Sequence, residues 1–253
     1  MKHILSSREP SVESRSVEPY YGRMRGHHGL DGPLRTERCM GRRFAQIAFT
    51  PQVKRNQEMH GSRRQYQRVE DFAEDGNILS SYEKEFIMER DGFYMASVSE
   101  SGWPYIQYRG GPKGFLRILS DNTIGFVDLR GNKQYISVGN LQTDSRVALF
   151  LMDYVRQQRL KILGHARIVE NTSEAAELIR TLKTDERSAV PERVITIQID
   201  AFDWNCPQHI AQRFTVDEIL QFLPLDELAK MKAAEEPLMS KRATEQQSIS
   251  KRK

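Results

Sequence analysis

The sequence predicts a mainly β protein, an antiparallel barrel with peripheral helices. Seven short runs rich in β-branched and aromatic residues lie between residues 93 and 202, and tight turns separate the paired runs. Only one late helical pattern, at 171–182, interrupts them. Many short strands joined by tight turns are typical of an antiparallel barrel. The chain has 253 residues, of which 38% are hydrophobic, and this is enough for a packed core.

The strands are expected to form three hairpins and one closing strand. In the first turn, at 99–102, Gly102 occupies the position where a hairpin needs a positive φ. The second turn, at 120–122, is rich in the polar residues that turns favour. The expected strands are 93–98 with 103–108, 115–119 with 123–127, 146–154 with 160–169, and finally 194–202.

Helices are expected on both sides of the strands. Thr50 followed by Pro51 has the pattern of an N-cap with proline at the first helical position. Asn171 with Glu174 three residues later resembles a capping box that opens a helix running through Leu182. The other expected helices lie at 51–59, 62–72 and 80–90, near Asn132, and near 225–234.

Composition divides the chain into three parts. Residues 1–39 have few aliphatic side chains and no sustained period, so we expect a disordered N-terminal extension. Residues 40–224 are expected to form the folded domain with its N-terminal helices, and 225–253 a helix with a basic disordered tail. Because the first boundary falls at Met40, we expect that residue to be a functional start.

The charge pattern argues against a nucleic-acid partner. The net charge is +4, but the last thirteen residues hold five basic against one acidic residue, and the first 39 hold seven against five. The middle of the chain therefore carries a net charge of −2, and its basicity lies in the tails. No apolar run approaches the roughly 20 residues of a membrane span, so no membrane partner is expected. Two cysteines are too few for a disulfide framework and favour a cytoplasmic location.

The segment 203–209 carries the densest side-chain chemistry of the chain. Its composition is open to three interpretations: a metal site, a cysteine nucleophile, or the wall of a planar cofactor. A metal site needs three or four ligands, and only Cys206 and His209 offer themselves, so no metal is expected. A thiol nucleophile needs a base and an orienting group, which the surrounding sequence does not indicate. Trp204, with amides and an imidazole nearby, suits stacking on a flat heteroaromatic ring.

Three further polar segments could bind a ligand. The loop after the fourth strand holds Gly131, Asn132 and Lys133 ahead of a helix, and a lysine beside a free helix start suits a phosphate. Alone, this pattern also fits a solvated turn. Arg109 ends the second strand before two glycines, and Arg159 opens the sixth strand. Each arginine fits a ligand site or an ordinary surface position.

Five ordered sequence blocks, at 93–105, 107–112, 131–140, 146–154 and 203–210, carry a family resemblance. From about residue 40 to 215 the chain resembles the pyridoxamine 5'-phosphate oxidase-like, FMN-binding split-barrel proteins. Within that family it is most similar to the branch called predicted flavin-nucleotide-binding proteins. The resemblance implies a homodimer of split β-barrels with FMN at the subunit interface.

The resemblance also implies site residues. Asn132 and Lys133 fall where the family holds the FMN phosphate, and Gln134 begins the adjoining helix. The other positions lie beside the flavin ring and ribityl chain, or come from the partner subunit to cover the flavin or substrate. They are Gln107, Tyr108, Arg109, Val127, Asp128 and Arg159 in the first group, and Trp204, Asn205, Gln208 and His209 in the second.

Departures from the oxidase pattern bear on the substrate. The oxidase has arginines where this chain has Gln107 and Asn132, and a lysine where it has Pro112. Its C-terminal Arg-x-His is absent, with 208–210 nearby instead. We therefore expect an FMN-dependent oxidoreductase with a small-molecule electron donor or acceptor other than pyridoxamine phosphate, and His209 as candidate acid–base residue. A flavin carrier without turnover, or a haem- or deazaflavin-binding relative, are the alternatives.

Overall fold

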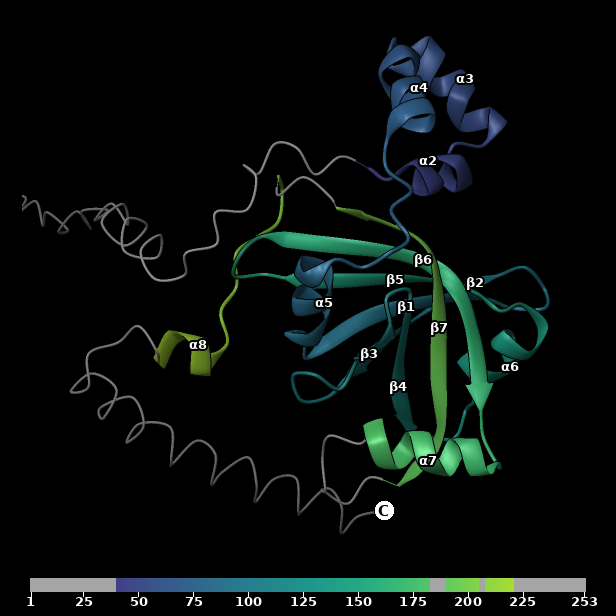
Figure 1. Cartoon of the computed structure of the whole chain (residues 1–253), viewed down its shortest axis with the longest axis vertical. Coiled ribbons are helices and arrows are strands. Elements are labelled where there is room, and N and C mark those ends of the chain that lie inside the picture. The colour runs from purple at the N-terminus through teal and green to yellow at the C-terminus, as the bar shows by residue number, and fades with distance from the viewer. Residues whose placement is uncertain (1–39, 183–189, 205–207, 221–253) are drawn as a thin grey trace, which may run out of the picture. The chain divides into compact units, whose positions relative to one another are not determined.

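The computed structural model describes residues 40–182, 190–204 and 208–220 (Figure 1). Within these residues, seven strands form one antiparallel sheet with helices around it, which confirms the predicted mainly β split-barrel class. The strands are β1 (Gly92–Val98), β2 (Pro104–Gly110), β3 (Arg117–Ser120), β4 (Thr123–Leu129), β5 (Arg146–Asp153), β6 (Gln158–Val169) and β7 (Pro191–Trp204).

The strand order is β2-β1-β5-β6-β7-β4-β3. The three predicted hairpins, β1–β2, β3–β4 and β5–β6, are all present, and Gly102 has the expected positive φ, at 83°. Three further pairs complete the sheet: β6 with β7, and two pairs of strands that are more distant in sequence, β1 with β5 and β4 with β7. Both edges of the sheet, β2 and β3, are therefore hairpin strands.

The sheet curls until its two ends face each other. β1 and β4 are separated by three strands in the sheet, yet the rings of Phe93 and Phe126 contact each other edge to face, with centroids 5.4 Å apart. Phe93 also stacks on Phe115, with centroids 5.7 Å apart. These rings lie in a core fully or nearly withdrawn from water, and β6 and β7 bend strongly around it (Figure 1).

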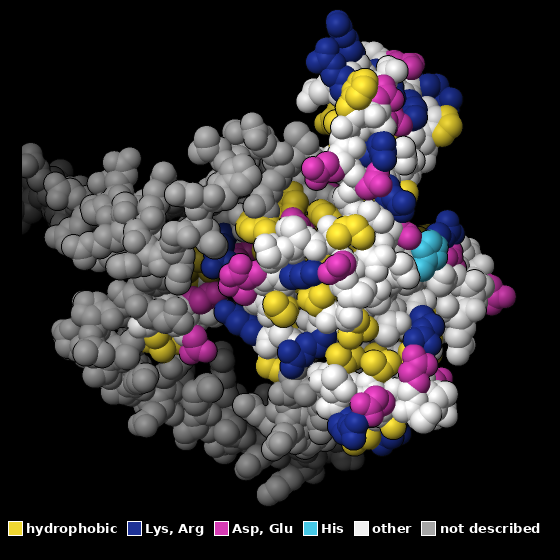
Figure 2. Space-filling model, viewed as in Figure 1, with side chains coloured by type: hydrophobic (Ala, Val, Ile, Leu, Met, Phe, Trp, Pro, Cys, Tyr) yellow, Lys and Arg dark blue, Asp and Glu magenta, His cyan; other side chains and the backbone are white. Residues whose placement is uncertain are grey.

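Among the described residues, from position 40 on, four helices precede the strands: α2 (Arg42–Ala48), α3 (Pro51–Met59), α4 (Arg63–Phe72) and α5 (Ser81–Met88). The Thr50 side chain caps α3 as predicted, accepting a hydrogen bond from the Val53 amide at 3.4 Å. Figure 2 shows Lys and Arg intermixed with Asp and Glu over α3 and α4. α2 was not expected from the sequence, and it packs against β7.

Three helices accompany the later strands: α6 (Ile136–Thr143), α7 (Ser173–Leu182) and α8 (Val216–Leu220). The helix expected near Asn132 begins four residues later, because Lys133 and Tyr135 both have positive φ and keep the backbone out of a helix until Ile136.

The predicted capping box at Asn171 was wrong by one residue. Thr172 caps α7 instead, with its Oγ1 3.0 Å from the Ala175 amide, while Asn171 has a φ of 56°. Glu174 bonds to Arg167 rather than to the cap.

Some expectations fall outside the described residues. These are the disordered extension at 1–39, the helix near 225–234, the basic tail, and Asn205 with Cys206. Among the helices that the structure describes, none is long and apolar enough to cross a membrane.

Candidate functional site

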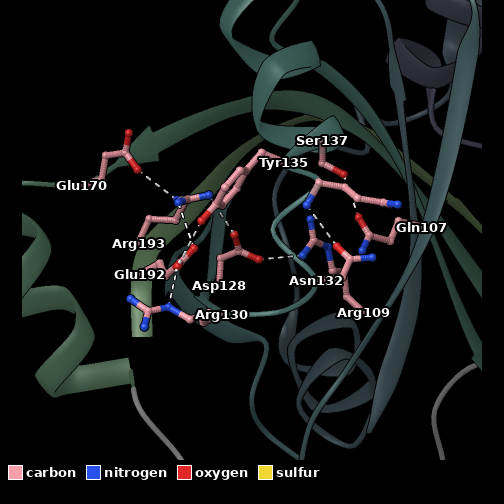
Figure 3. Close-up of polar contacts among 11 residues, drawn as sticks. Gln107, Arg109, Asp128, Arg130, Asn132, Tyr135, Ser137, Glu170, Glu192 and Arg193 are labelled. Carbon is pink, nitrogen blue, oxygen red and sulfur yellow. Dashed lines mark hydrogen bonds and ion pairs between the residues drawn. The ribbon is translucent and has the colours of Figure 1, made fainter. Parts of the chain in front are cut away.

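An ion pair joins the two ends of the curled sheet. Arg109 lies on edge strand β2, and its Nη1 donates to Oδ1 of Asp128 on β4 at 2.6 Å (Figure 3). Side chains alternate along a strand, so Gln107 and Arg109 share one face of β2. The guanidinium of Arg109 also lies 5.8 Å from the Phe126 ring centroid. This pair therefore marks the place where β2 approaches β4 without pairing to it.

Asp128 is shared by two arginines. Its Oδ2 accepts a longer hydrogen bond, 3.5 Å, from Nη1 of Arg193 on β7. Asp128 and Arg193 are both only 7% exposed. Burial raises the pKa of the Asp128 carboxyl, although the charges of Arg109 and Arg193 act in the opposite direction.

Arg193 bonds to two further carboxylates. Its Nε donates to Glu170 at 2.9 Å and its Nη2 to Glu192 at 3.1 Å. Its guanidinium also lies 5.1 Å from the centroid of the Tyr135 ring, at the start of α6. Arg193 thus links the Arg109–Asp128 pair to the loop that precedes α6 (Figure 3).

A β-bulge explains how Glu192 and Arg193 reach the same site. Neighbouring residues on a regular strand point to opposite faces. Opposite β7, however, Asp128 pairs with Arg193 while the next residue, Leu129, pairs with Pro191. Glu192 is therefore the extra residue of a bulge, and bulges redirect side chains.

The loop 130–135 presents basic and amide groups to solvent. Lys133 is exposed, with a φ of 61°, and Asn132 folds its side-chain oxygen onto the Gln134 amide at 3.1 Å. Tyr135, the N-cap of α6, offers no side-chain cap to the helix. The first amides of α6 therefore keep their capacity to bind an anion beside Lys133.

Gln107 lies next to the same helix. The Ser137 hydroxyl donates to its Oε1 at 2.9 Å, one residue after α6 begins. Further along α6, Asn140 Nδ2 donates to the Ser97 hydroxyl of β1 at 3.0 Å, and both side chains are buried. These two contacts fix α6, and with it the loop, against the β1–β2 hairpin.

The structure thus joins Arg109 to Asp128 and Gln107 to the start of α6, and Asn132, Lys133 and Gln134 lie on the loop before that helix. Two of their sequence neighbours point elsewhere. Tyr108 lies on the opposite face of β2, 56% exposed, against the Tyr94 ring, and partial burial raises its pKa. Val127 packs into a small apolar cluster with α7.

A second group of expected residues lies around the first residues of β6 and the last residue of β7. Trp204, the last residue of β7, pairs with Leu160, which directly follows Arg159. Asp128 on β4 pairs with Arg193, near the first residue of the fourteen-residue strand β7, so the two groups lie at opposite ends of that strand. The Trp204 indole packs on Tyr82 and Phe86, and its Nε1 donates to Glu83 at 2.9 Å.

The segment 208–210 lies beside the turn before Arg159. Gln157 Nε2 donates to the Ile210 carbonyl at 2.7 Å, next to Gln208 and His209. Both of these side chains are exposed, and His209 has a φ of 64°. Within one chain, the expected site residues therefore form two separate groups.

Two of the expected arginines have unused hydrogen-bonding capacity. The Nε atoms of Arg109 and Arg159 are buried without a hydrogen-bond partner in the described part of the chain. Arg117 on β3 shares this feature. Buried donors normally find a partner, so these atoms are candidates for ligand contacts. No group of three or more His, Cys, Asp and Glu that could hold a metal ion occurs among the described residues.

Sequence reasoning missed Glu192, Arg193, Tyr135 and Glu170. An acidic and a basic residue at the start of an apolar strand are ordinary features, and no spacing in the sequence pointed to a bulge at Glu192. Their role becomes visible only when β4 and β7, which are distant in sequence, lie side by side.

A part of the chain matches one known protein family. Residues 82–204 match the sequence model of the family described as "Pyridoxamine 5'-phosphate oxidase". No curated protein matches the chain.

Several solved structures are similar to part of the chain. HupZ of Group A Streptococcus is 18% identical, with a TM-score of 0.42 over 54% of this chain and 100% of its own. A putative pyridoxamine 5'-phosphate oxidase from Lactobacillus delbrueckii is 19% identical (TM-score 0.40; 51% and 95% covered). An FMN-binding protein from Syntrophomonas wolfei is 12% identical (TM-score 0.39; 59% and 97% covered).

The matched segment begins in α5, ends at the last residue of β7, and includes all seven strands of the sheet. It also contains the Arg109–Asp128 pair, the loop 130–135 and the bulge at Glu192. Over this segment, a little under half of its length, the chain is similar to the pyridoxamine 5'-phosphate oxidase family.

Proposed function

We propose that the protein binds FMN and acts as an FMN-dependent oxidoreductase on a small-molecule electron donor or acceptor. One observation carries the proposal. The exposed Lys133 lies on a loop that starts two residues after Asp128, the partner of Arg109, and leads into the uncapped start of α6, where Ser137 donates to Gln107. The loop and the start of α6 offer partners for a phosphate group, and Gln107 and Arg109 offer partners for a polar ring system.

The residues present fit FMN. Lys133 and the first amides of α6 would hold the phosphate. The buried Nε of Arg109, which has no partner among the described residues, and the Gln107 amide would face the more polar parts of the flavin. Bound FMN would supply hydride or electron transfer at its ring, and the protein would supply orientation and electrostatics. The positive groups at Lys133 and Arg159 would favour a reduced, anionic flavin.

We further propose that a second copy of the chain completes the site. Arg159, Trp204, Gln208 and His209 lie in a group of their own, separate from the loop 130–135, so one chain does not gather all the residues that the family resemblance implies. An exposed apolar surface on the β1–β2 hairpin is available for the contact. It contains Tyr94, Ile106 and Tyr108, which are 37%, 64% and 56% exposed. His209, exposed and near Arg159, stays the candidate acid–base residue, supplied by the second copy.

Pyridoxamine phosphate is not the proposed substrate. Substrate phosphate recognition in the oxidase depends on basic residues that this chain replaces, as at Gln107, whose amide oxygen accepts from Ser137. A neutral amide with its oxygen already engaged offers no charge to a second phosphate.

The decisive experiment is to purify the full chain and identify any chromophore that it releases on denaturation. FMN in near one-to-one amount with the chain, or uptake of added FMN with quenching of its fluorescence, is the expected result. A colourless protein that does not bind added FMN would refute the proposal. Release of a haem or a deazaflavin would identify that group, and not FMN, as the cofactor. Reduction of the bound flavin by a panel of nicotinamide nucleotides and other donors then separates an enzyme from a carrier.

A further inference from the structure

The loop 130–135 is held at both of its ends by one carboxylate. Oε1 of Glu192 accepts from Nε of Arg130 at 2.9 Å and from the Tyr135 hydroxyl at 3.3 Å (Figure 3). Its other oxygen, Oε2, accepts from Arg193 at 3.1 Å. The hydrogen bond from Arg130 lowers the pKa of the Glu192 carboxyl, so the group is ionised at neutral pH.

The backbone between these two contacts is in an unfavourable conformation. Lys133 and Tyr135 both have left-handed φ values, 61° and 51°, which are unfavourable for an L-residue. Such conformations persist when surrounding contacts hold them in place. Glu192 supplies contacts of this kind at the first and last residues of the loop, and Arg193 adds its contact with the Tyr135 ring.

The bulge on β7 makes this arrangement possible. A regular strand would send the Glu192 side chain to the face opposite Arg193. The extra residue turns the Glu192 side chain toward the loop, where it also binds Arg193, which has Asp128 and Glu170 as further partners. The loop is therefore fastened to a buried ion network in the wall of the barrel.

We propose that Glu192 is a positioning residue for phosphate recognition: by holding both ends of the loop 130–135, it fixes Lys133 and the start of α6 in the geometry that receives the phosphate of FMN. This inference rests on the proposed function. It identifies a role for an acidic residue that simple charge reasoning would consider unfavourable near a phosphate.

Charge and position make opposite predictions for Glu192. If the carboxylate influenced the site only through its charge, its removal would tighten the binding of an anionic ligand. If it positions the loop, its removal frees Lys133 and weakens binding despite the lost negative charge. The sign of the change therefore separates the two roles.

The test compares Glu192→Ala and Glu192→Gln with the wild type, using FMN and riboflavin as probes. Riboflavin has the same ring and ribityl chain but no phosphate. We expect Glu192→Ala to raise the Kd for FMN about tenfold, the equivalent of one charge-assisted hydrogen bond, and to leave the Kd for riboflavin within about twofold. Glu192→Gln keeps an oxygen for Arg130 and Tyr135, so its effect on FMN should be smaller and in the same direction.

Glu174→Ala is the matched control. Glu174 also pairs with an arginine, Arg167, but on the outside of the barrel and without contact to the loop. This variant should leave both dissociation constants unchanged. Equal losses of FMN and riboflavin binding in Glu192→Ala, or tighter FMN binding, would overturn the positioning role.

Hydrogen exchange tests the same inference without flavin. In the flavin-free protein, Glu192→Ala should speed amide exchange in the segment 130–136 and leave β5 and β6 protected. Glu174→Ala should leave exchange in the segment 130–136 unchanged. Unchanged exchange in 130–136 would overturn the inference. If the wild type bound no FMN, the proposed function would fail, and exchange would still decide whether Glu192 holds the loop.

Discussion

Asp128 shows how a buried carboxylate can be both costly and necessary. Burial raises its pKa even though Arg109 and Arg193 attract its charge. Ionised Asp128 is therefore less favourable in the folded than in the unfolded chain. Its side chain nevertheless holds Arg109 at 2.6 Å, on the strand edge that faces the proposed flavin.

The raised pKa gives a pH signature. As pH rises from about 4, the usual pKa of an aspartate, the unfolded chain ionises first and gains stability relative to the folded one. We therefore expect the free energy of unfolding of the wild type, minus that of Asp128→Asn, to fall until pH passes the raised pKa. Urea titrations at several pH values measure this difference. A difference that rises with pH would contradict the assigned direction.

Asp128→Ala should behave differently from Asp128→Asn. Alanine leaves the buried Arg109 guanidinium without its carboxylate, and uncompensated buried charges cost about 3–5 kcal/mol. Asparagine keeps an acceptor oxygen for Arg109 and should cost about 1 kcal/mol or less at neutral pH. Chemical denaturation of both variants checks the contrast, and equal losses would mean that the oxygen kept by asparagine does not compensate the Arg109 guanidinium.

Lys133 is the residue on which the phosphate assignment depends most. Its ammonium is exposed and free to meet a ligand at the start of α6. Lys133→Ala should weaken FMN binding by about 1.5–3 kcal/mol and leave riboflavin binding unchanged, because only FMN carries the phosphate. Fluorescence titration measures both. Lys84→Ala, which removes a lysine paired with Asp121 outside the site, is the control. An unchanged FMN affinity in Lys133→Ala would place the phosphate elsewhere.

At the scale of single elements, β7 is shaped by two bulges. The second lies where Leu163 pairs with Ala201 and Gly164 pairs with Ile199, so that Asp200 is the extra residue. Oδ2 of Asp200 lies 2.6 Å from Nδ1 of His165. Each bulge turns an acidic side chain toward a basic partner, and each lets the long strand bend around the core.

Gly164 is required at the second bulge by lack of space. A Cβ at this position would lie 2.2 Å from the Gln198 carbonyl oxygen, a backbone atom that cannot move aside easily. Gly164→Ala should therefore lower the free energy of unfolding by about 1–3 kcal/mol, as overpacking does. Gly139→Ala is the control, because a Cβ there would contact nothing and alanine favours the helix α6. Thermal or urea unfolding measures both, and similar losses would show that the crowding at Gly164 relaxes cheaply.

Elements were predictable from the sequence to the extent that their signals are local. The hairpin at Gly102 and the cap at Thr50 depend on a few neighbouring residues, and both were predicted correctly. The cap of α7 was misplaced by one residue because Asn171 and Thr172 are both good caps, and the left-handed φ of Asn171 is not encoded by its identity. The bulges of β7 could not be predicted, since a bulge is defined by the register of two strands.

At the scale of the whole sheet, the strand class was predictable and the strand order was not. Alternating and β-branched runs indicate strands, but the neighbours β1–β5 and β4–β7 pair residues that are 52 to 75 positions apart, and no periodicity specifies such partners. The candidate site shares this limit. Gln107, Arg109 and Asp128 came from the family resemblance, while Arg193 and Glu192 become neighbours of Asp128 only through the β4–β7 pairing.

The apolar surface on the β1–β2 hairpin allows a test of the proposed homodimer. Ile106 is 64% exposed beside Tyr94 and Tyr108, on the outward face of an edge hairpin. An edge strand with exposed apolar side chains is unusual unless a partner covers it. We expect the wild type to be a dimer by sedimentation velocity, and Ile106→Lys to shift it to monomer by placing a charge in the contact.

The same variant connects assembly with flavin binding. If Arg159 and the group around Trp204 reach the flavin from a second copy, the monomeric Ile106→Lys protein should lose FMN affinity at least tenfold, although it changes none of the residues expected to touch FMN. Met59→Lys, at a side chain 76% exposed on α3, should alter neither property. A monomeric variant that keeps full FMN affinity would show that Gln107, Arg109 and the loop 130–135 suffice. The separate group at Arg159 and Trp204 would then need another role.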